Sequence, residues 1–164
     1  MTGGDATGDD TPPARVSAGM PAPGFDLAGT GGRRYRLADA AGGPLVLLFY
    51  PADGSPVCTA QLRSYSEDLD RFTRLGSPVW ALSPQDVASH ERFAADKGLG
   101  VPLLADVGAQ VGRAYGVLGP LGFYRRSVFV VDATGTVRFA RRSLSSLTFL
   151  PAGRVLEAVQ AASA

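Results

Sequence analysis

The stretch PLVLLFYPADGSPVC, residues 44–58, joins an apolar run to a proline, a small polar loop and the only cysteine of the chain. The apolar run, residues 44–50, is typical of a central strand that is covered on both faces. Pro51 has no N–H group, so the strand can end there without leaving a hydrogen-bond donor unpaired. Cys58 stands where the following helix is expected to open. Because α/β sheets place active sites at such strand–helix junctions, this loop is the first candidate for a functional site.

Two interpretations of Cys58 are open at this point. Free cysteine is among the most buried residue types and behaves as a small hydrophobe, so the side chain could simply fill the core. A helix start, however, supplies unpaired backbone N–H groups and a positive dipole end, and both favour the thiolate form of a cysteine. The second interpretation predicts a reactive sulfur.

Composition excludes several classes of function. A chain of 164 residues with 45% hydrophobic content suits one globular domain, and no apolar run is long enough to span a membrane. Sixteen basic and fifteen acidic residues leave a formal charge of +1, which gives no electrostatic case for binding nucleic acid or a membrane surface. One cysteine and one histidine cannot form an intramolecular disulfide or a zinc site, so we expect neither a metal nor another cofactor. The N-terminus lacks the features of a secretory signal, and we expect a cytoplasmic protein whose thiol stays reduced.

The order of sequence patterns predicts the fold class. Residues 1–18 are rich in Gly, Asp, Thr and Pro and are expected to form a disordered tail, while residues 19–164 are expected to form one domain. Strand and helix patterns alternate and end in a hairpin and a helix. The expected elements are a hairpin over 24–37, strands over 44–50, 78–82, 102–104, 127–131 and 136–140, and helices over 58–72, 86–98, 107–115 and 151–162. This order predicts an α/β fold in which helices flank a mixed central β-sheet.

The loop before Cys58 also resembles a known signature. Pro51, Ser55 and Cys58 match the pattern Pro-x-x-x-(Thr/Ser)-x-x-Cys of the peroxiredoxins, the AhpC/TSA superfamily. The segments GMPAPGFDLAGTGGRRYRL, WALSPQDVASHERFAADKGLGVPLLADVGAQVGRAYGV and RRSVFVVDATGTVRF are similar to other parts of that family, in the same order. The chain most resembles the bacterioferritin comigratory protein (PrxQ) and alkyl hydroperoxide reductase E branches, in a one-cysteine form. The resemblance implies a thioredoxin-like fold.

The same resemblance implies a thiol-dependent peroxidase that reduces hydrogen peroxide and organic hydroperoxides. Cys58 would attack one peroxide oxygen, and Arg126 would stabilise both the thiolate and the charge on the departing oxygen. Ser55, where the family more often has threonine, would accept a hydrogen bond from the peroxide and donate one to the thiolate. Pro51 would shield the thiolate from water. The backbone amides of Val57 and Cys58 would complete the substrate site by donating to the reacting oxygens.

The second half of such a cycle needs a thiol from outside the chain. Attack would leave Cys58 as a sulfenic acid, and Arg63 occupies the position where many relatives carry a second cysteine. The expected reductant is thioredoxin, a glutaredoxin-like protein or a low-molecular-weight thiol, and the chain is expected to be a monomer or a homodimer. Two alternatives stay open: a thiol-based redox sensor, or a thiol–disulfide exchange protein. The second alternative is weakened because Gln61 stands where the partner cysteine of a C-x-x-C pair would be.

Several other residues are given no chemistry. Arg125 has no counterpart in the family pattern, and Arg141-Arg142 reads as an ordinary charged pair, so all three are expected at the surface. His90 lies in the polar segment ASHERF and is expected to be solvated. Gln61 stands where glutamate is frequent in the family, so this chain lacks a carboxylate near the thiolate.

Overall fold

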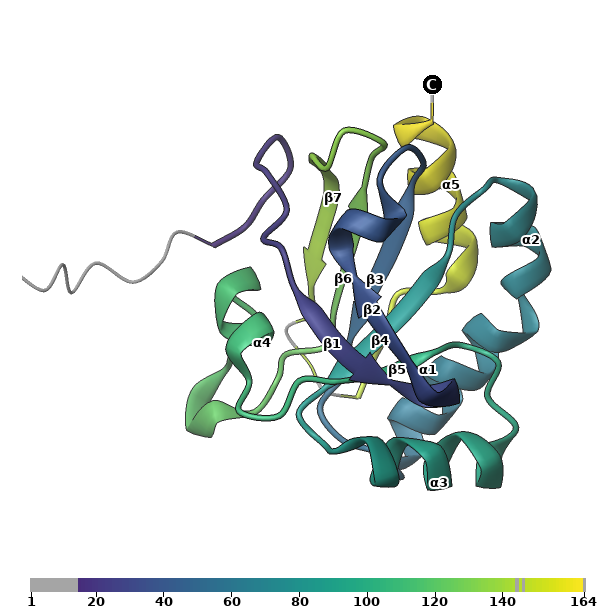
Figure 1. Cartoon of the computed structure of the whole chain (residues 1–164), viewed down its shortest axis with the longest axis vertical. Coiled ribbons are helices and arrows are strands. Elements are labelled where there is room, and N and C mark those ends of the chain that lie inside the picture. The colour runs from purple at the N-terminus through teal and green to yellow at the C-terminus, as the bar shows by residue number, and fades with distance from the viewer. Residues whose placement is uncertain (1–14, 144, 146, 164) are drawn as a thin grey trace, which may run out of the picture.

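Strand β3 (Leu45–Phe49) lies inside a seven-stranded mixed sheet in the computed structural model of the chain, which describes residues 15–143, 145 and 147–163 (Figure 1). It pairs in parallel with β4 (Val79–Ser83) and antiparallel with β6 (Ser127–Val131). Every residue of β3 is buried, as its apolar sequence predicts for a strand with neighbours on both sides and cover on both faces.

The remaining strands extend the sheet in both directions, in the order β2-β1-β5-β4-β3-β6-β7. On one side, β5 (Leu103–Ala105) runs parallel to β4, and the antiparallel hairpin of β1 (Asp26–Gly29) and β2 (Arg33–Arg36) completes the edge. On the other side, β7 (Val137–Arg142) pairs antiparallel with β6. Both predicted hairpins and the mixed sheet are therefore confirmed.

Helices cover both faces of this sheet (Figure 1). They are α1 (Pro56–Glu67), α2 (Leu69–Arg74), α3 (Val87–Lys97), α4 (Gln110–Tyr115) and α5 (Ala152–Ala162), with short 3₁₀ turns η1 (Thr30–Gly32), η2 (Leu37–Ala40) and η3 (Pro120–Gly122). Within the described ranges, none of these helices combines the length and the hydrophobicity that crossing a bilayer requires.

Two predicted helices differ from the observed ones by more than one residue at a boundary. The helix expected over 58–72 begins two residues earlier, at Pro56, and is divided at Asp68 into α1 and α2. The helix expected over 107–115 begins only at Gln110 because Ala109 has a φ of +61°, outside the helical region. The buried Asp106 carboxylate instead accepts hydrogen bonds from the first backbone amides of α4.

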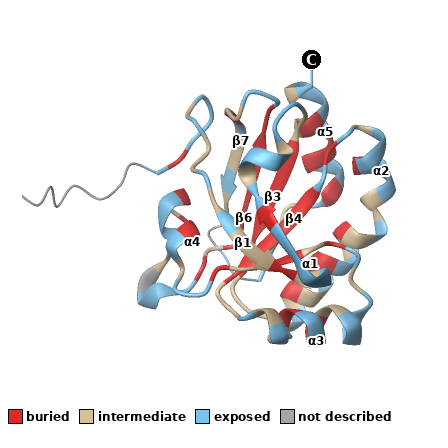
Figure 2. Cartoon of the chain, in the orientation of Figure 1, coloured by how far each residue is buried: buried red, intermediate tan, exposed pale blue. Residues whose placement is uncertain are grey.

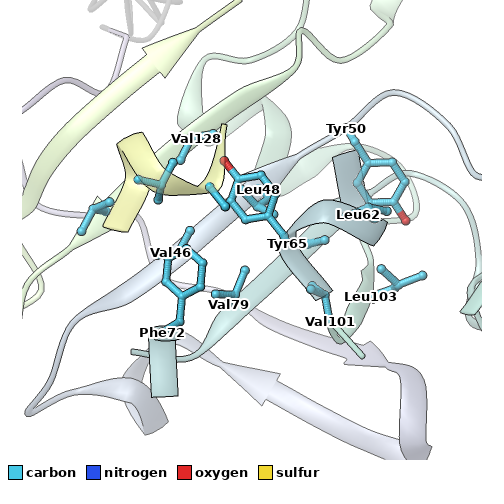
Figure 3. Packing of buried hydrophobic residues seen from close by; sticks show 14 of the residues in the cluster. Val46, Leu48, Tyr50, Leu62, Tyr65, Phe72, Val79, Val101, Leu103 and Val128 are labelled. Carbon is cyan, nitrogen blue, oxygen red and sulfur yellow. The ribbon is translucent and has the colours of Figure 1, made fainter. Parts of the chain in front are cut away.

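The sheet separates two apolar clusters. Successive side chains of a strand point to opposite faces, so Val46 and Leu48 join one cluster, while Leu47 and Phe49 join the other. The first cluster includes residues of α1, α2, α3 and α5, and Figure 3 shows its side chains from the strands beside its side chains from the helices. The second includes Trp80 and packs against the β1–β2 hairpin and α4. Figure 2 shows the resulting distribution, with buried strands inside and exposed residues on the outer faces of the helices.

The N-terminal segment is anchored by an arginine that was expected to be solvated. Most of the expected tail, residues 1–14, lies outside the described residues, but Val16 is 4% exposed and belongs to the second apolar cluster. Arg142 donates from Nη2 to the carbonyl oxygen of Val16 over 2.7 Å and from Nε to that of Gly116 over 3.0 Å. Its guanidinium also lies 5.1 Å from the ring centre of Phe129. The surface prediction is therefore wrong for Arg142, which is half-buried and joins β7 to the N-terminal segment.

A methyl group added at Gly112 would collide with a buried ring. An ideal Cβ at this position would lie 2.5 Å from Cε1 of Tyr124, whose hydroxyl donates to Asp106. We expect Gly112→Ala to lower the free energy of unfolding by about 1–3 kcal/mol, the usual cost of overpacking. Gly153→Ala is the matched control, because no atom lies within 4 Å of its added Cβ; it should leave stability unchanged or raise it by up to about 1 kcal/mol. Chemical denaturation measures both changes, and equal effects would contradict this account of the packing.

Candidate active site

The first turn of α1 is organised around Ser55. Ser55 is the N-cap residue, Pro56 takes the first helical position, where its missing N–H is no loss, and Cys58 follows in the same turn. The Ser55 hydroxyl oxygen accepts a hydrogen bond from the backbone N–H of Cys58 over 3.2 Å. This cap fixes the cysteine at the positive end of the helix, with an exposed fraction of 0%.

Strand pairing brings Arg126 to the same place. β6 pairs with β3 so that Ser127 is opposite Phe49, and the residue before Ser127 therefore emerges at the end of β3 where the Cys58 loop begins. Arg126 Nη1 lies 3.2 Å from Cys58 Sγ, although the two residues are 68 positions apart in the sequence. The arginine is itself 3% exposed, so the contact is shielded from water.

Gln61 holds the guanidinium in this position. It follows Cys58 by three residues on α1 and thus shares a helix face with it. Its Oε1 accepts a hydrogen bond from Arg126 Nη1 over 2.7 Å, from the nitrogen that also faces the sulfur. Within the described part of the chain, Gln61 Nε2 is buried and has no hydrogen-bond partner. The neutral amide of Gln61 therefore orients Arg126. A glutamate at this position would carry a negative charge and would compete with the thiolate for the guanidinium.

The other residues predicted for the site line the same loop. Pro51 is half-buried two residues after the end of β3, and its carbonyl oxygen lies 3.5 Å from Gln85 Nε2. The Cys58 amide is engaged by the Ser55 cap, whereas the Val57 amide belongs to the first turn, whose N–H groups have no carbonyl partner inside the helix. The structure thus brings the predicted residues Ser55, Val57, Cys58 and Arg126 together beyond the end of β3, and the predicted Pro51 begins the loop that leads to them.

Near the active site, the prediction for His90 is wrong. It was expected to be solvated, but it is 0% exposed, and Nδ1 lies 2.7 Å from Oδ2 of Asp53 in the Cys58 loop. Asp53 also accepts a hydrogen bond from the hydroxyl of Tyr50 over 2.7 Å. Figure 3 shows Tyr50 at one end of the first apolar cluster, with its hydroxyl oxygen directed away from Leu48 and Tyr65. The segment ASHERF gives no local sign of this network, because the partners of His90 come from a different loop and a different strand.

The arrangement favours a nucleophilic thiolate. The first turn of α1 and the Arg126 guanidinium both present positive charge to Cys58 Sγ, and their effect is strong because little water screens it. Arginine remains charged at any physiological pH and offers several donors in a fixed plane, so it can also face an oxygen that binds beside the sulfur. In the ranges that the structure describes, no three His, Cys, Asp or Glu side chains are grouped as metal ligands would be.

Comparison with known families gives a match over most of the chain. The model of the AhpC/TSA family matches residues 18–140. A curated relative, the chloroplastic peroxiredoxin Q of Arabidopsis thaliana, is 37% identical over 127 residues, which cover 76% of this chain and 59% of the relative. The chain thus spans about three fifths of the length of that plant protein.

Two solved structures are similar over nearly their whole length. The Xanthomonas campestris bacterioferritin comigratory protein is 29% identical with a TM-score of 0.76, and the match covers 85% of this chain and 92% of that one. Peroxidoxin BcpB from Mycobacterium tuberculosis is 28% identical with a TM-score of 0.80, covering 90% of this chain and 98% of that one. The sheet and helices described above are therefore those of a known architecture.

Replacing Arg126 tests whether its contact with Cys58 activates the sulfur. We expect Arg126→Gln to slow alkylation of Cys58 by iodoacetamide by about tenfold or more, since a hydrogen bond to a charged group contributes about 1.5–3 kcal/mol and the thiolate is the nucleophile. Mass spectrometry follows the alkylation, with Cys58→Ser as the blank. Arg125→Gln removes a neighbouring charge outside the contact and should change nothing. An equal loss in both variants would show that overall charge, rather than the contact with Arg126, is responsible.

Proposed function

The chain belongs to the AhpC/TSA family, and on that premise we propose that it is a peroxiredoxin: a thiol-dependent peroxidase that reduces hydrogen peroxide and organic hydroperoxides through Cys58. The observation that carries the proposal is the 3.2 Å separation of Arg126 Nη1 and Cys58 Sγ at a capped helix start. Peroxide reduction needs a thiolate and a cation beside the O–O bond, and a guanidinium at this distance from the sulfur supports the proposal on both counts.

The first step is attack of the Cys58 thiolate on one peroxide oxygen. An S–O bond forms and the O–O bond breaks, so the sulfur is oxidised to a sulfenic acid and the second oxygen departs as hydroxide or alkoxide, which takes up a proton. Negative charge moves from sulfur to the departing oxygen during this step. Arg126 stabilises both ends of that movement, because its guanidinium can donate to the sulfur and to the oxygen from one plane.

The remaining residues of the loop position the substrate. One lone pair of the Ser55 hydroxyl is engaged by the Cys58 amide, which leaves the other to accept from a peroxide and the hydrogen to be donated to the sulfur. The Val57 amide supplies a further donor at the helix start. Pro51 limits access of water to the thiolate. Serine lacks the methyl group that restricts the rotamer of threonine, so this hydroxyl is held mainly by the cap.

An external thiol completes the cycle. The thiol sulfur attacks the sulfenic sulfur, water leaves, and a mixed disulfide forms; a second thiol then releases Cys58 in its reduced form. The chain has one cysteine, so both thiols come from outside it, and a cytoplasmic setting would supply them. Thioredoxin, a glutaredoxin-like protein and a low-molecular-weight thiol are the candidate reductants.

Organic hydroperoxides are included among the substrates because of the similar bacterial structure. The Xanthomonas campestris bacterioferritin comigratory protein has alkyl peroxide reduction activity. An alkyl group adds only apolar bulk to the oxygen that departs, so the same thiolate and guanidinium serve both kinds of peroxide.

Stoichiometric oxidation of the reduced protein tests the first step. We expect Cys58 to react with hydrogen peroxide at least about a hundredfold faster than free cysteine, because one preorganised donor at a developing anion is worth that much. Rapid quenching followed by mass spectrometry follows the added oxygen on Cys58. Cys58→Ser should not react. A rate like that of free cysteine would overturn the proposal.

Turnover with added thiols tests the second step. After one equivalent of peroxide, mass spectrometry should find the sulfenic acid alone, and a low-molecular-weight thiol should convert it to a mixed disulfide of the expected mass. Sustained peroxide consumption with that thiol plus a glutaredoxin, or with thioredoxin and its reductase, then identifies the reductant class. Rapid oxidation without turnover with any of these would instead indicate a redox sensor.

A further inference from the structure

A second polar cluster lies beside the Cys58–Arg126 pair and has no part in the cycle described above. At its centre is His90, the only histidine of the chain, on the first turns of α3. One ring nitrogen, Nδ1, lies 2.7 Å from Asp53 Oδ2, and the other, Nε2, lies 3.0 Å from the carbonyl oxygen of Leu104 in β5. A histidine enclosed on both sides in this way is held in one orientation.

The atoms nearest to the two ring nitrogens, Asp53 Oδ2 and the Leu104 carbonyl oxygen, are both hydrogen-bond acceptors. A carbonyl oxygen has no hydrogen to give, so Nε2 must carry the hydrogen of the contact with Leu104. An ionised Asp53 requires a hydrogen on Nδ1 as well, because a bare Nδ1 would set two lone pairs against each other across 2.7 Å. The geometry therefore calls for an imidazolium that faces a carboxylate.

The surroundings of Asp53 favour its ionised form. Burial disfavours the charge, but hydrogen bonds from His90, Tyr50 and Ser89 outweigh burial and hold the pKa of Asp53 below its ordinary value. Burial, followed by the Asp53 charge, raises the pKa of Tyr50 well above its ordinary value, so this hydroxyl remains a donor. The Asp53 side chain is 7% exposed, and the attraction between the two charges is correspondingly little screened.

Other charged groups near the ring are engaged elsewhere. On α3 itself, Asp86 caps the helix by accepting from the Ser89 amide over 2.8 Å, and Glu91 accepts from the Gly31 amide over 2.8 Å. From β5, the Leu104 carbonyl faces the ring. The Tyr50 hydroxyl oxygen lies 3.3 Å from Nδ1, and because its hydrogen goes to Asp53 Oδ1 over 2.7 Å, it presents a lone pair to Nδ1. Among these groups, the charge that the ring contacts directly is that of Asp53.

Asp53 connects the histidine to the active-site loop, residues 51–55. Besides the ring, its carboxylate accepts from Tyr50 at the end of β3 and from the Ser89 hydroxyl on α3, each over 2.7 Å. Its backbone N–H donates to Oε1 of Gln85 over 3.2 Å. One side chain thus ties the middle of the loop to α3, and the Ser55 cap that positions the Cys58 amide follows two residues later.

We propose that His90 is a positioning residue for peroxide reduction: as a buried imidazolium it holds Asp53, and through Asp53 the loop that carries Pro51 and Ser55 against Cys58. The inference rests on the proposed peroxidase function for its kinetic consequence, but not for the charge state of the ring. Loss of the second ring proton would leave a lone pair facing the carboxylate, and the loop would separate from α3. Peroxide reactivity then depends on this proton as well as on ionisation of Cys58.

The charge state is tested on the unaltered protein, without an affinity tag. Because the chain has one histidine, the imidazole ¹⁵N resonances belong to His90 without further assignment. We expect both nitrogens to show protonated shifts at neutral pH in the wild type. In Asp53→Asn the amide can donate to Nδ1, so we expect a neutral ring with hydrogen on Nε2 alone. A neutral ring in the wild type would overturn the proposal, whatever the peroxidase activity.

The positioning role is tested by the second-order rate constant for oxidation of Cys58 by hydrogen peroxide. We expect Asp53→Asn and His90→Gln to lower it by about tenfold to a hundredfold, the usual effect of displacing a reacting group by about 1 Å. The wild-type rate should also fall on the alkaline side of its pH profile, and this fall should be absent from Asp53→Asn. Glu91→Gln, on the same helix, is the control and should match the wild type in both respects.

The outcomes separate this inference from the proposed function. Slow oxidation of the wild type combined with an imidazolium would refute the peroxidase assignment and leave the ion pair standing. Rapid oxidation with unchanged rates and pH profiles in both variants would refute the positioning role. If the variants unfold, two measurements on the wild type still test the positioning role: the ¹⁵N shifts and the rate of Cys58 oxidation at alkaline pH. If the ring loses its second proton and the rate does not change, His90 is not a positioning residue.

Discussion

Arg126 Nη1 lies 3.2 Å from the buried Cys58 Sγ only because two parts of the chain are each positioned by interactions of their own. The sulfur is placed by a helix cap, through Ser55, and the guanidinium by the pairing of β6 with β3. A shift of one residue in that strand pairing would turn Arg126 to the other face of the sheet. The apolar residues on both faces of β3 and β6 prevent the shift, so the packing of the core also maintains the geometry of the site.

Most of the fold and the loop around Cys58 could be predicted from sequence because their signals are local. Apolar runs of strand length, turn residues and Ser-Pro at a helix start depend on neighbours only a few positions away. Arg126 is different, since nothing local distinguishes it from Arg125. Only the family resemblance selected it, and only the sheet explains its place, because 68 positions separate it from Cys58.

Two of the features that sequence reasoning missed are set by distant contacts. His90 lies in a segment that reads as polar, but its surroundings are Asp53 and Leu104, which come from another loop and another strand. Arg142 looks like one of two strand charges until the carbonyl oxygens of Val16 and Gly116 accept hydrogen bonds from its guanidinium. In both cases a polar side chain leaves the solvent because its partners come from elsewhere in the fold.

The late start of α4 has a local cause. The carboxylate of Asp106 accepts from the amides of Val111 and Gly112, which an earlier helix would have used, and no apolar pattern in the sequence reports this contact.

The complete burial of Cys58 has a consequence for how the protein would be recycled. A donor as large as another protein cannot bring its own sulfur against an enclosed atom while the first turn of α1 is intact. The start of that turn depends on one residue, Ser55, whose hydroxyl accepts from the Cys58 amide and whose carbonyl accepts from Thr59, so a protein donor would reach the sulfur by fraying of the turn. With a protein as the thiol donor, the rate at which Cys58 is reduced would then be limited by how often this turn frays, rather than by the reactivity of the donor's sulfur. Small mercaptans would not be limited in this way.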